Sequence, residues 1–242
     1  APADWWVGDA AVSMTDSATT FVLHGPDSER IEASCPLPGL VNVQNAALAL
    51  VMTMRAGVPA ETAVAALASA HNIPGRMQRI TRRDGVRGTC IVDFAHTPDA
   101  MELALKAIRQ ITPGRLIVVF GSDGDRDRGK RPMLGEVAAR LADVLIVTDE
   151  NPRSEDPRTI RDAILSGVRS VRPDLADVEE ITTWRGDAVR RGVEICGPQD
   201  TVVVTGKGHE PFQEVAGDFI RYNDAPIMRQ AAEAKWGPVT PA

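Results

Sequence analysis

The sequence predicts an α/β protein whose larger part is a doubly wound, mostly parallel sheet. From Cys90 onwards, short apolar runs rich in β-branched residues alternate with segments of helical periodicity. This alternation is typical of parallel strands joined by crossover helices that cover both faces of a sheet. Before residue 73 the pattern is different, because alternating strands are followed by two apolar helices. The chain is therefore expected to contain two regions of unlike architecture.

The first region is predicted to hold antiparallel strands and then a helical pair. Turn-forming residues at 25–28 separate two of the alternating runs and indicate a hairpin. The first helix stops at Gly57, and Pro59 opens the second. Because 72–75 (Asn-Ile-Pro-Gly) interrupts the pattern, we place a domain boundary near 73–83. The expected strands are 10–14, 20–23 and 30–33, and the expected helices are 40–56 and 59–70.

The second region is predicted to alternate strand and helix. Each apolar run precedes a segment with one apolar stripe at helical spacing. The expected strands are 90–93, 116–120, 144–148, 180–183, 201–204 and 218–222. The expected helices are 98–110, 132–141, 158–168, 187–196 and a last one that ends near 234.

Composition limits the possible functions. The net charge of −6 argues against a general nucleic-acid or membrane-surface binder, which usually carries a basic face. No apolar run reaches the roughly 18 residues that a membrane span needs. Three widely spaced cysteines without a CxxC pair indicate reduced thiols, and hence the cytoplasm. The chain starts Ala1-Pro2-Ala3 without Met, which fits a signal-peptide cleavage site or a chain that begins inside a larger protein, and nothing else in the sequence indicates secretion. We expect a monomer.

Charged, glycine-containing loops follow four of the predicted strands. In a doubly wound sheet the ligand site lies at the carboxyl ends of the strands, so these loops are expected to share one edge. Their glycines let backbone amides approach a ligand closely, and their arginines and lysines can bind carboxylates or phosphates. Carboxylates such as Asp93, Asp125, Asp127, Glu150 and Glu210 can accept an ammonium group, so the mixed charges favour a zwitterionic ligand. The loops are 93–99, 121–131, 149–153 and 205–210.

Several familiar catalytic motifs are missing from the sequence. It contains no GxxxxGK[ST] phosphate loop, no GxGxxG and no GxSxG. None of its four histidines is paired with cysteine at metal-ligand spacing. We therefore expect no unaided hydrolysis or phosphoryl transfer by these residues.

Six segments in order resemble the Mur ligases and, within that family, the type that adds a diamino acid to a UDP-linked muramoyl dipeptide (MurE). Any one of them is weak evidence, but their shared order is specific. The likeness covers nearly the whole chain and is clearest between Leu40 and Glu210. The segments are 42–45, 74–77, 93–98, 124–132, 150–153 and 206–210.

The resemblance implies a fold and a reaction. Residues 1–78 would be the end of a central ATP-binding domain, and 79–242 a Rossmann-like C-terminal domain that presents the amino acid. The implied substrates are ATP with Mg²⁺, meso-diaminopimelate and UDP-N-acetylmuramoyl-L-alanyl-D-glutamate, joined through an acyl phosphate. The family's phosphate loop, modified lysine and magnesium ligands precede the matching region, so the resemblance implies that the isolated chain is inactive.

The resemblance also implies roles for individual residues. On the nucleotide side, Asn45 would contact adenine, Arg76 and Asp93 the ribose, and His96 and Thr97 the phosphates. On the amino-acid side, Arg126 would orient the substrate, and the motif Glu150-Asn151-Pro152-Arg153 would select diaminopimelate. In that motif Arg153 would bind the distal carboxylate, which lysine lacks. Gly206 and Glu210 would hold the distal head, with Glu210 accepting its ammonium group.

The chain departs from the family pattern at Glu150, where the motif usually has Asp, and in two other places. One is Ser122-Asp123 and the other is Tyr222-Asn223-Asp224, and we expect neither to touch the named contacts. The alternatives are a lysine-adding enzyme, a cyanophycin or folylpolyglutamate synthetase, or a non-catalytic module that binds an amino acid or nucleotide. A nicotinamide oxidoreductase is disfavoured because GxGxxG is missing.

Overall fold

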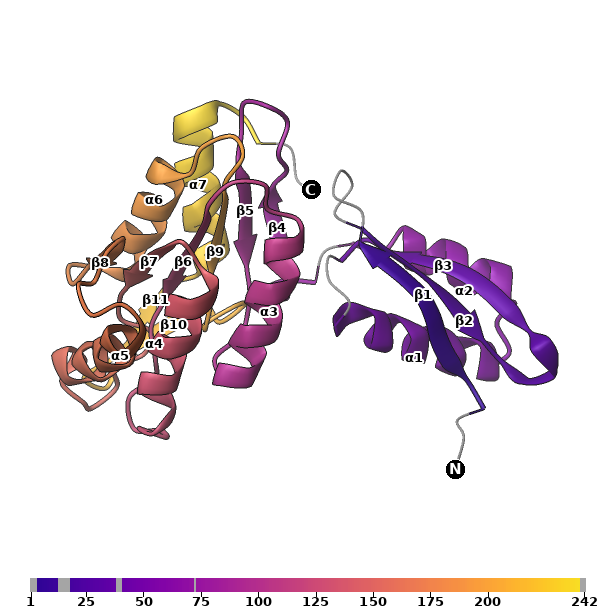
Figure 1. The fold of residues 1–242 in the computed structure, drawn as a ribbon, viewed down its shortest axis with the longest axis horizontal. Coiled ribbons are helices and arrows are strands. Elements are labelled where there is room, and N and C mark those ends of the chain that lie inside the picture. Colours follow the sequence, from indigo (N-terminus) through magenta and orange to yellow (C-terminus); the bar gives the residue numbers. More distant parts are fainter. Residues whose placement is uncertain (1–3, 13–17, 38–40, 72, 240–242) are drawn as a thin grey trace. The chain divides into compact units, whose positions relative to one another are not determined.

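The computed structural model describes residues 4–12, 18–37, 41–71 and 73–239. The chain divides into two compact units, Ala1–Asn72 and Ile73–Ala242. Figure 1 shows a small antiparallel sheet with two helices in the first unit and a larger layered α/β body in the second. Met14 and Leu40, which were predicted to lie in a strand and a helix, fall outside the described residues.

The first unit packs two helices against an antiparallel sheet. Its strands are ordered β1-β2-β3, and both neighbouring pairs are antiparallel, which confirms the predicted hairpin. Alternate residues of β2 and β3, such as Phe21 and Ala33, meet Val43 and Leu50 of the first helix in one apolar core. The elements are β1 (Trp6–Val12), β2 (Thr19–His24), β3 (Arg30–Cys35), α1 (Val41–Arg55) and α2 (Ala60–Ala68).

The second unit is built on a six-stranded sheet in the order β4-β5-β9-β6-β7-β8. All neighbouring pairs are parallel except β4 with β5. The predicted fold class, a doubly wound and mostly parallel sheet, is therefore confirmed. The strands are β4 (Gln78–Thr81), β5 (Thr89–Val92), β6 (Leu116–Phe120), β7 (Val144–Val147), β8 (Val178–Glu180) and β9 (Thr201–Val204).

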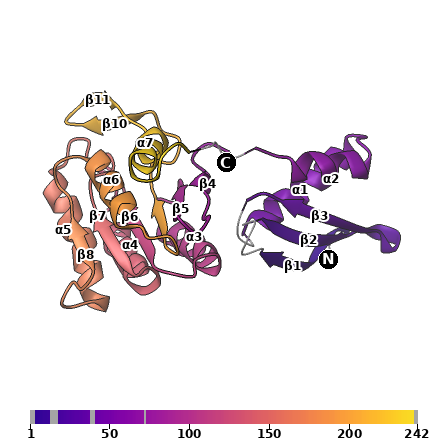
Figure 2. The ribbon, with the colours of Figure 1, turned by 90° about the horizontal axis from the view of Figure 1, so that it is seen from above.

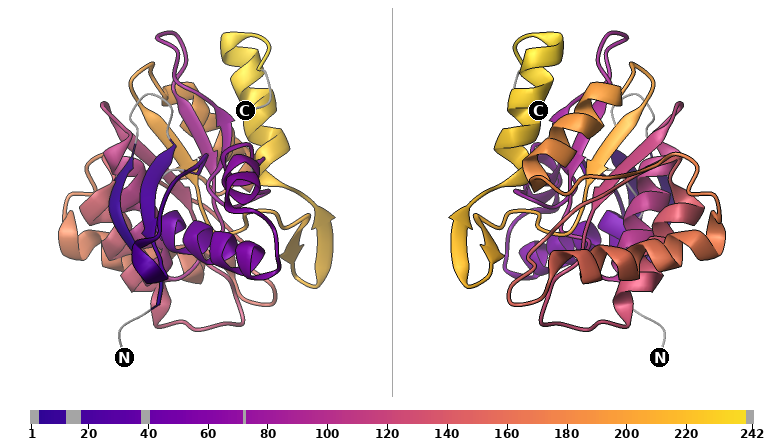
Figure 3. Two further views of the ribbon diagram at one scale, coloured as in Figure 1. Left: turned by 90° about the vertical axis from the view of Figure 1, so that its right-hand side faces the viewer. Right: turned by 90° about the vertical axis from the view of Figure 1, so that its left-hand side faces the viewer.

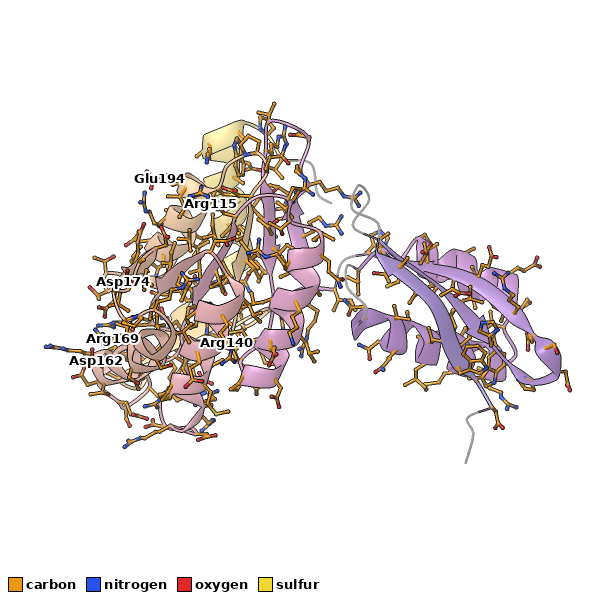
Figure 4. All side chains as sticks on the ribbon, viewed as in Figure 1. Arg115, Arg140, Asp162, Arg169, Asp174 and Glu194 are labelled. Atoms are coloured by element: carbon orange, nitrogen blue, oxygen red, sulfur yellow. The ribbon has the colours of Figure 1, made fainter. Side chains whose placement is uncertain are left out.

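Helices cover both faces of this sheet. Figure 2 shows α6 and α7 on one face and α3, α4 and α5 on the other. The central strands are fully buried because both faces are covered, which explains their continuous apolar runs. Charged side chains lie on the outer helix surfaces, including the exposed Arg140, Asp162 and Glu194 labelled in Figure 4. The helices are α3 (Pro98–Gln110), α4 (Lys130–Leu141), α5 (Pro157–Val171), α6 (Arg185–Ile195) and α7 (Asp224–Trp236).

Two features of the second unit differ from the expectation. β4 was not predicted, and it adds an antiparallel edge to the sheet. The expected last strand does not join the sheet, because β11 (Asp218–Arg221) pairs only with β10 (Phe212–Val215) in a separate two-stranded hairpin. Figure 3 shows this hairpin projecting beyond the sheet, next to the start of α7.

Candidate functional site

The sheet order gathers the four charged loops. The strands that precede them are β5, β9, β6 and β7, which are successive neighbours in the sheet. Because all four are parallel, their carboxyl ends lie along one edge. Two groups of polar side chains form there, the first after β7 and β9 and the second after β5.

The first group, called here the β7/β9 cluster, consists of Asn151, Arg153, Lys207, Glu210 and Glu214. At its centre the Lys207 side chain is fully buried. Lys207 Nζ donates to Asn151 Oδ1 (2.7 Å), Glu210 Oε2 (2.9 Å) and the Phe212 carbonyl oxygen (2.7 Å). The three donors of the ammonium group thus have three acceptors, which is how a buried charge is stabilised.

Glu210 accepts a second hydrogen bond, from Asn151 Nδ2 at 3.1 Å. Burial opposes ionisation of Glu210, but the bond from Lys207 and this one outweigh it and lower the pKa of its carboxyl group. Glu210 is therefore a carboxylate at neutral pH. It can accept an ammonium group of a ligand, because its side chain remains 38% exposed.

Arg153 is tied to three neighbouring segments. Its Nε donates to Glu214 Oε2 (3.1 Å), its NH1 donates to the Gly124 carbonyl oxygen (3.0 Å), and its NH2 lies 3.7 Å from Asp123 Oδ1. Its backbone φ is +54°, a left-handed conformation that is costly for a residue other than glycine and is often found at functional sites. Backbone bonds to β10 hold it there: Arg153 N donates to the Glu214 carbonyl oxygen and Ala216 N donates to that of Arg153.

A cavity of about 210 Å³ opens beside these groups. Its polar walls are Asn151, Arg153, Glu210 and Glu214, and its apolar walls include Phe212 and Phe219 of the hairpin. The hairpin that was not predicted as such therefore supplies one side of the candidate site.

Glu150 and Gly206 meet beneath the cluster. Glu150 is 3% exposed, and burial followed by the nearby Asp123 carboxylate raises the pKa of its carboxyl group to about 7. A Cβ on Gly206 would lie 2.3 Å from Glu150 Oε2, and Gly206 has a φ of +110°. Only glycine fits here, so these two residues set the spacing between the loops after β7 and β9.

A buried ion pair fixes the bases of the same two loops. Arg185 and Asp224 are fully buried, and Arg185 Nε donates to Asp224 Oδ1 at 2.9 Å. Arg185 NH2 also donates to the Thr205 carbonyl oxygen at 2.8 Å, just before Gly206. Gln213 Nε2 donates to the Glu150 carbonyl oxygen at 2.9 Å. The loops after β7 and β9 are thus cross-linked from below as well as within the cluster.

The second group, called here the β5 cluster, consists of Arg76, Asp93, Phe94 and His96. Asp93 accepts from the backbone N–H groups of Met77 (2.7 Å) and Ala95 (2.9 Å). Burial nevertheless dominates and raises the pKa of its carboxyl group. The Arg76 guanidinium lies 4.3 Å from the centre of the Phe94 ring, and the side chain is exposed. His96 Nδ1 lies 2.9 Å from the Phe94 carbonyl oxygen.

The structure places the predicted residues unevenly. Glu150, Asn151, Pro152, Arg153, Gly206 and Glu210 come together, as do Arg76, Asp93 and His96. Thr97 caps α3 by accepting from Ala100 N at 3.3 Å. Arg126 is exposed and donates to the neighbouring Asp125 carbonyl oxygen at 3.1 Å. Asn45 lies exposed on α1 of the first unit. The ligand roles of all these residues stay predictions.

The expectation that the two sequence departures avoid the named contacts is wrong. Asp123 Oδ1 accepts from Asn151 Nδ2 at 3.0 Å, because the loop after β6 folds over the one after β7. A Cβ on Gly124 would lie 1.9 Å from the Pro152 carbonyl oxygen, which shows how close these loops are. Asn223 Nδ2 donates to the Glu210 carbonyl oxygen at 3.1 Å.

Two cations that were expected to face a ligand have other partners. Lys207 is fully buried, as described above. Arg131 is 3% exposed and forms paired bonds to Glu155 Oε1 (2.8 Å) and Oε2 (3.0 Å). This bidentate pair lowers the pKa of the Glu155 carboxyl group to about 2 and anchors the loop after β6 to the start of α5.

Sequence reasoning did not single out Glu214 or Arg185. Glu214 is part of β10, which has no strong strand signal because Pro211 and charged residues surround it. Arg185 is the first residue of α6, and the start of this helix was predicted two residues too late. The burial of Arg185 could have been predicted from the sequence only if its partner Asp224 had been known.

The structure also bears on metal binding and on membrane insertion. Among the residues it describes, no group of three or more His, Cys, Asp or Glu side chains is placed to hold a metal ion. We therefore assign the expected Mg²⁺ to no residue of this chain. In the same residues, no helix has the length and apolar character needed to cross a membrane.

The fold and its charged edge define a Rossmann-like domain suited to binding a charged ligand at the carboxyl ends of its strands. Residues 75–208 match the family model described as Mur ligase, glutamate ligase domain. This match covers more than half of the chain, and the chain belongs to the Mur ligase family. The family predicted from the six motifs is therefore confirmed.

Curated relatives align over almost the whole chain. A UDP-N-acetylmuramyl-tripeptide synthetase of Leifsonia xyli subsp. xyli is 42% identical over 97% of this chain and 45% of its own length. A UDP-N-acetylmuramoyl-L-alanyl-D-glutamate–2,6-diaminopimelate ligase of Streptomyces avermitilis is 40% identical over 97% of this chain and 46% of its own length. The chain thus spans about half the length of these relatives.

A solved structure of a UDP-N-acetylmuramoyl-L-alanyl-D-glutamate–2,6-diaminopimelate ligase is also similar. It is 35% identical, with a TM-score of 0.66 over 96% of this chain and 46% of that one. The likeness therefore extends to the fold of both units.

Proposed function

We propose that this chain is part of an ATP-dependent ligase that adds meso-diaminopimelate to UDP-N-acetylmuramoyl-L-alanyl-D-glutamate in the synthesis of peptidoglycan. Residues 1–78 would belong to a central ATP-binding domain, and 79–242 would present the amino acid. The curated relatives support the class of reaction, because the Streptomyces avermitilis protein is named for this addition. The enzyme would be cytoplasmic.

The observation that carries the proposal is the β7/β9 cluster beside its small cavity. Arg153 and Glu210 lie on the wall of one cavity and carry opposite charges. A guanidinium group binds a carboxylate with two directed hydrogen bonds, and a carboxylate accepts from an ammonium group. A distal head that carries both a carboxylate and an ammonium group, as in diaminopimelate, is complementary to this pair.

The proposed chemistry is the formation of an amide bond. The terminal carboxylate of the dipeptide would be activated as an acyl phosphate, and the α-amine of the acceptor would attack it with loss of phosphate. The contribution of this chain is to hold the acceptor by its distal end, so that the amine meets the acyl carbon in a fixed orientation. Such positioning can supply several kcal/mol of the activation barrier.

On the nucleotide side we propose the predicted residues Asn45, Arg76, Asp93, His96 and Thr97. The exposed Arg76 on the Phe94 ring and the His96 ring next to it offer cationic or donor groups to an anionic ligand. Lys130 adds a second cation near this group, and its Nζ donates to the His96 carbonyl oxygen at 3.1 Å. ATP would supply the phosphoryl group that activates the dipeptide carboxylate.

The test is release of ADP by the full-length protein that contains this sequence, with ATP, Mg²⁺, the UDP-muramoyl dipeptide and either meso-diaminopimelate or lysine. We expect a higher kcat/KM with diaminopimelate. Arg153→Ala should lower that value by about 10- to 100-fold, which is the effect of one or two hydrogen bonds to a charged group. Arg158→Ala, on the exposed face of α5, serves as the matched control and should change little.

Two other outcomes would change the proposal. Turnover with lysine alone would keep the ligase but replace the acceptor. No turnover with either diamino acid would point to a different amide ligase of the same family, such as a cyanophycin or folylpolyglutamate synthetase.

A further inference from the structure

The most informative contact in the second unit is the one between Arg153 and Glu214. Arg153 Nε donates to Glu214 Oε2 at 3.1 Å, and the two side chains are 17% and 29% exposed. Both lie on the wall of the 210 Å³ cavity. In the proposed function the Arg153 guanidinium group binds the distal carboxylate of the acceptor. In the structure it is already bonded to a carboxylate of the protein itself.

We propose that Glu214 is a specificity-determining residue that competes with the distal carboxylate of the acceptor for Arg153. The inference rests on the proposed function, because it concerns the same cavity. Its physical basis is the number of partners that Arg153 has in the protein. Glu214, the Gly124 carbonyl oxygen and Asp123 engage the Nε, NH1 and NH2 atoms respectively.

The charge of the surroundings supports this competition. Asp123, Glu210 and Glu214 are near Arg153, whereas Lys207 is fully buried and bonded to Glu210. The three carboxylates therefore exceed the two cations before any ligand binds. The distal carboxylate of the acceptor must therefore enter an environment that already has an excess of negative charge.

The consequence for an acceptor without a distal carboxylate follows directly. Such an acceptor normally binds more weakly, because it leaves a partly buried arginine without a hydrogen-bonding partner. Here Glu214 keeps Arg153 paired when lysine or a shorter diamino acid binds, so this penalty is largely removed. The distal ammonium group of that acceptor would still find Glu210 and the other carboxylates.

The consequence for diaminopimelate is the opposite. Its distal carboxylate gains Arg153 only by displacing Glu214, so one carboxylate replaces another. The selectivity for diaminopimelate over lysine should therefore be lower than the Glu150–Arg153 motif alone implies. Glu214 lies on β10 at the cavity rim, and a small movement of this side chain would release Arg153.

The test uses Glu214→Gln in the full-length protein, since glutamine keeps the shape of the side chain and removes its charge. The quantity to compare is the ratio of kcat/KM with meso-diaminopimelate to kcat/KM with lysine. We expect Glu214→Gln to raise this ratio by about 10-fold or more, because a charged competitor is replaced by a neutral group.

Two further variants separate competition from other effects. Asp218→Asn removes one negative charge from the same hairpin at an exposed position on β11 and should leave the ratio unchanged. In the Arg153→Ala background, Glu214→Gln should also leave the ratio unchanged, because the proposed coupling requires both side chains. An unchanged ratio in Glu214→Gln, or an equal rise in Asp218→Asn, would overturn the proposal.

Binding distinguishes this proposal from the proposed function. If the wild-type protein turns over neither diamino acid, the proposed function fails. Titration calorimetry with the same two amino acids then tests whether Glu214 competes with a ligand carboxylate for Arg153. A gain in affinity for diaminopimelate relative to lysine in Glu214→Gln supports it. Equal affinity changes for the two amino acids overturn it.

Discussion

The two polar groups at the sheet edge are held in different ways. In the β7/β9 cluster, side chains bond to one another: Lys207 joins Asn151 and Glu210, and Arg153 joins Glu214. In the β5 cluster the polar side chains do not bond to one another in this way. Asp93 and His96 have backbone partners, and Arg76 is exposed. One group is a connected side-chain network around a buried lysine, and the other combines a buried aspartate with an exposed arginine.

This difference indicates which part of the site is organised before a ligand binds. A network whose members fix one another keeps its geometry without a ligand, so less conformational entropy is lost on binding. An exposed arginine has more rotamers to lose when it orders on a ligand. We infer that the Lys207, Asn151 and Glu210 part of the amino-acid side is formed in advance. Arg153 exchanges Glu214 for the ligand, and the nucleotide side becomes ordered on binding.

The largest expected effect comes from breaking the ion pair beneath the β7/β9 cluster. Arg185→Met leaves Asp224 buried without its cation, which typically costs about 3–5 kcal/mol of unfolding free energy. Arg191→Met on the same helix removes a half-exposed pair with Glu179 and should cost no more than about 1 kcal/mol.

The measurement is denaturant unfolding followed by tryptophan fluorescence. Trp5→Phe and Trp6→Phe provide the background, so that Trp184 and Trp236 report the second unit. Similar losses in Arg185→Met and Arg191→Met would mean that the buried pair does not support this unit more than a surface pair does.

The sequence predicted the sheet of the second unit well, because buried parallel strands leave a clear signal. The runs 116–120 and 201–204 match β6 and β9, and 98–110 matches α3. β4 and β10 were missed for a physical reason. Each has four residues, and polar residues such as Gln78 and Glu214 begin or interrupt the apolar pattern.

The sequence predicted which loops meet, but not how their side chains pair. Strand order brings β9 between β5 and β6, and this could not be read from the chain order. The partner of a charged side chain depends on that order. Lys207 was expected to face a ligand, because the pairing of its loop with Asn151 could not be predicted; in the structure it is fully buried and bonded to Asn151 and Glu210.

A second effect sharpens the comparison through pH. The pKa of Glu150 is raised from 4.5 to about 7 in the folded protein, chiefly by burial. The folded state therefore binds more protons than the unfolded state between these values. This stability is fully present below about pH 4.5 and is lost as pH rises through about 7.

Glu150→Gln should remove this dependence. The loss of unfolding free energy between pH 4.5 and pH 8 should be smaller in the variant by about 3 kcal/mol, from a shift of about 2.5 pH units. Unfolding curves of both proteins across this range give the difference, in which other titrating groups cancel. Parallel pH profiles would show that Glu150 ionises as readily when folded as when unfolded.

The smallest effect is expected in the β5 cluster. Arg76→Ala removes an exposed guanidinium group from the Phe94 ring, and cation–π contacts at exposed sites contribute about 0.5–1 kcal/mol. Arg153→Ala, in contrast, removes a side chain with three partners and should cost about 1–3 kcal/mol. Unfolding measured in the same tryptophan background compares the two directly. If Arg76→Ala proves as costly as Arg153→Ala, the nucleotide side is also organised in advance, and the contrast between the two clusters does not hold.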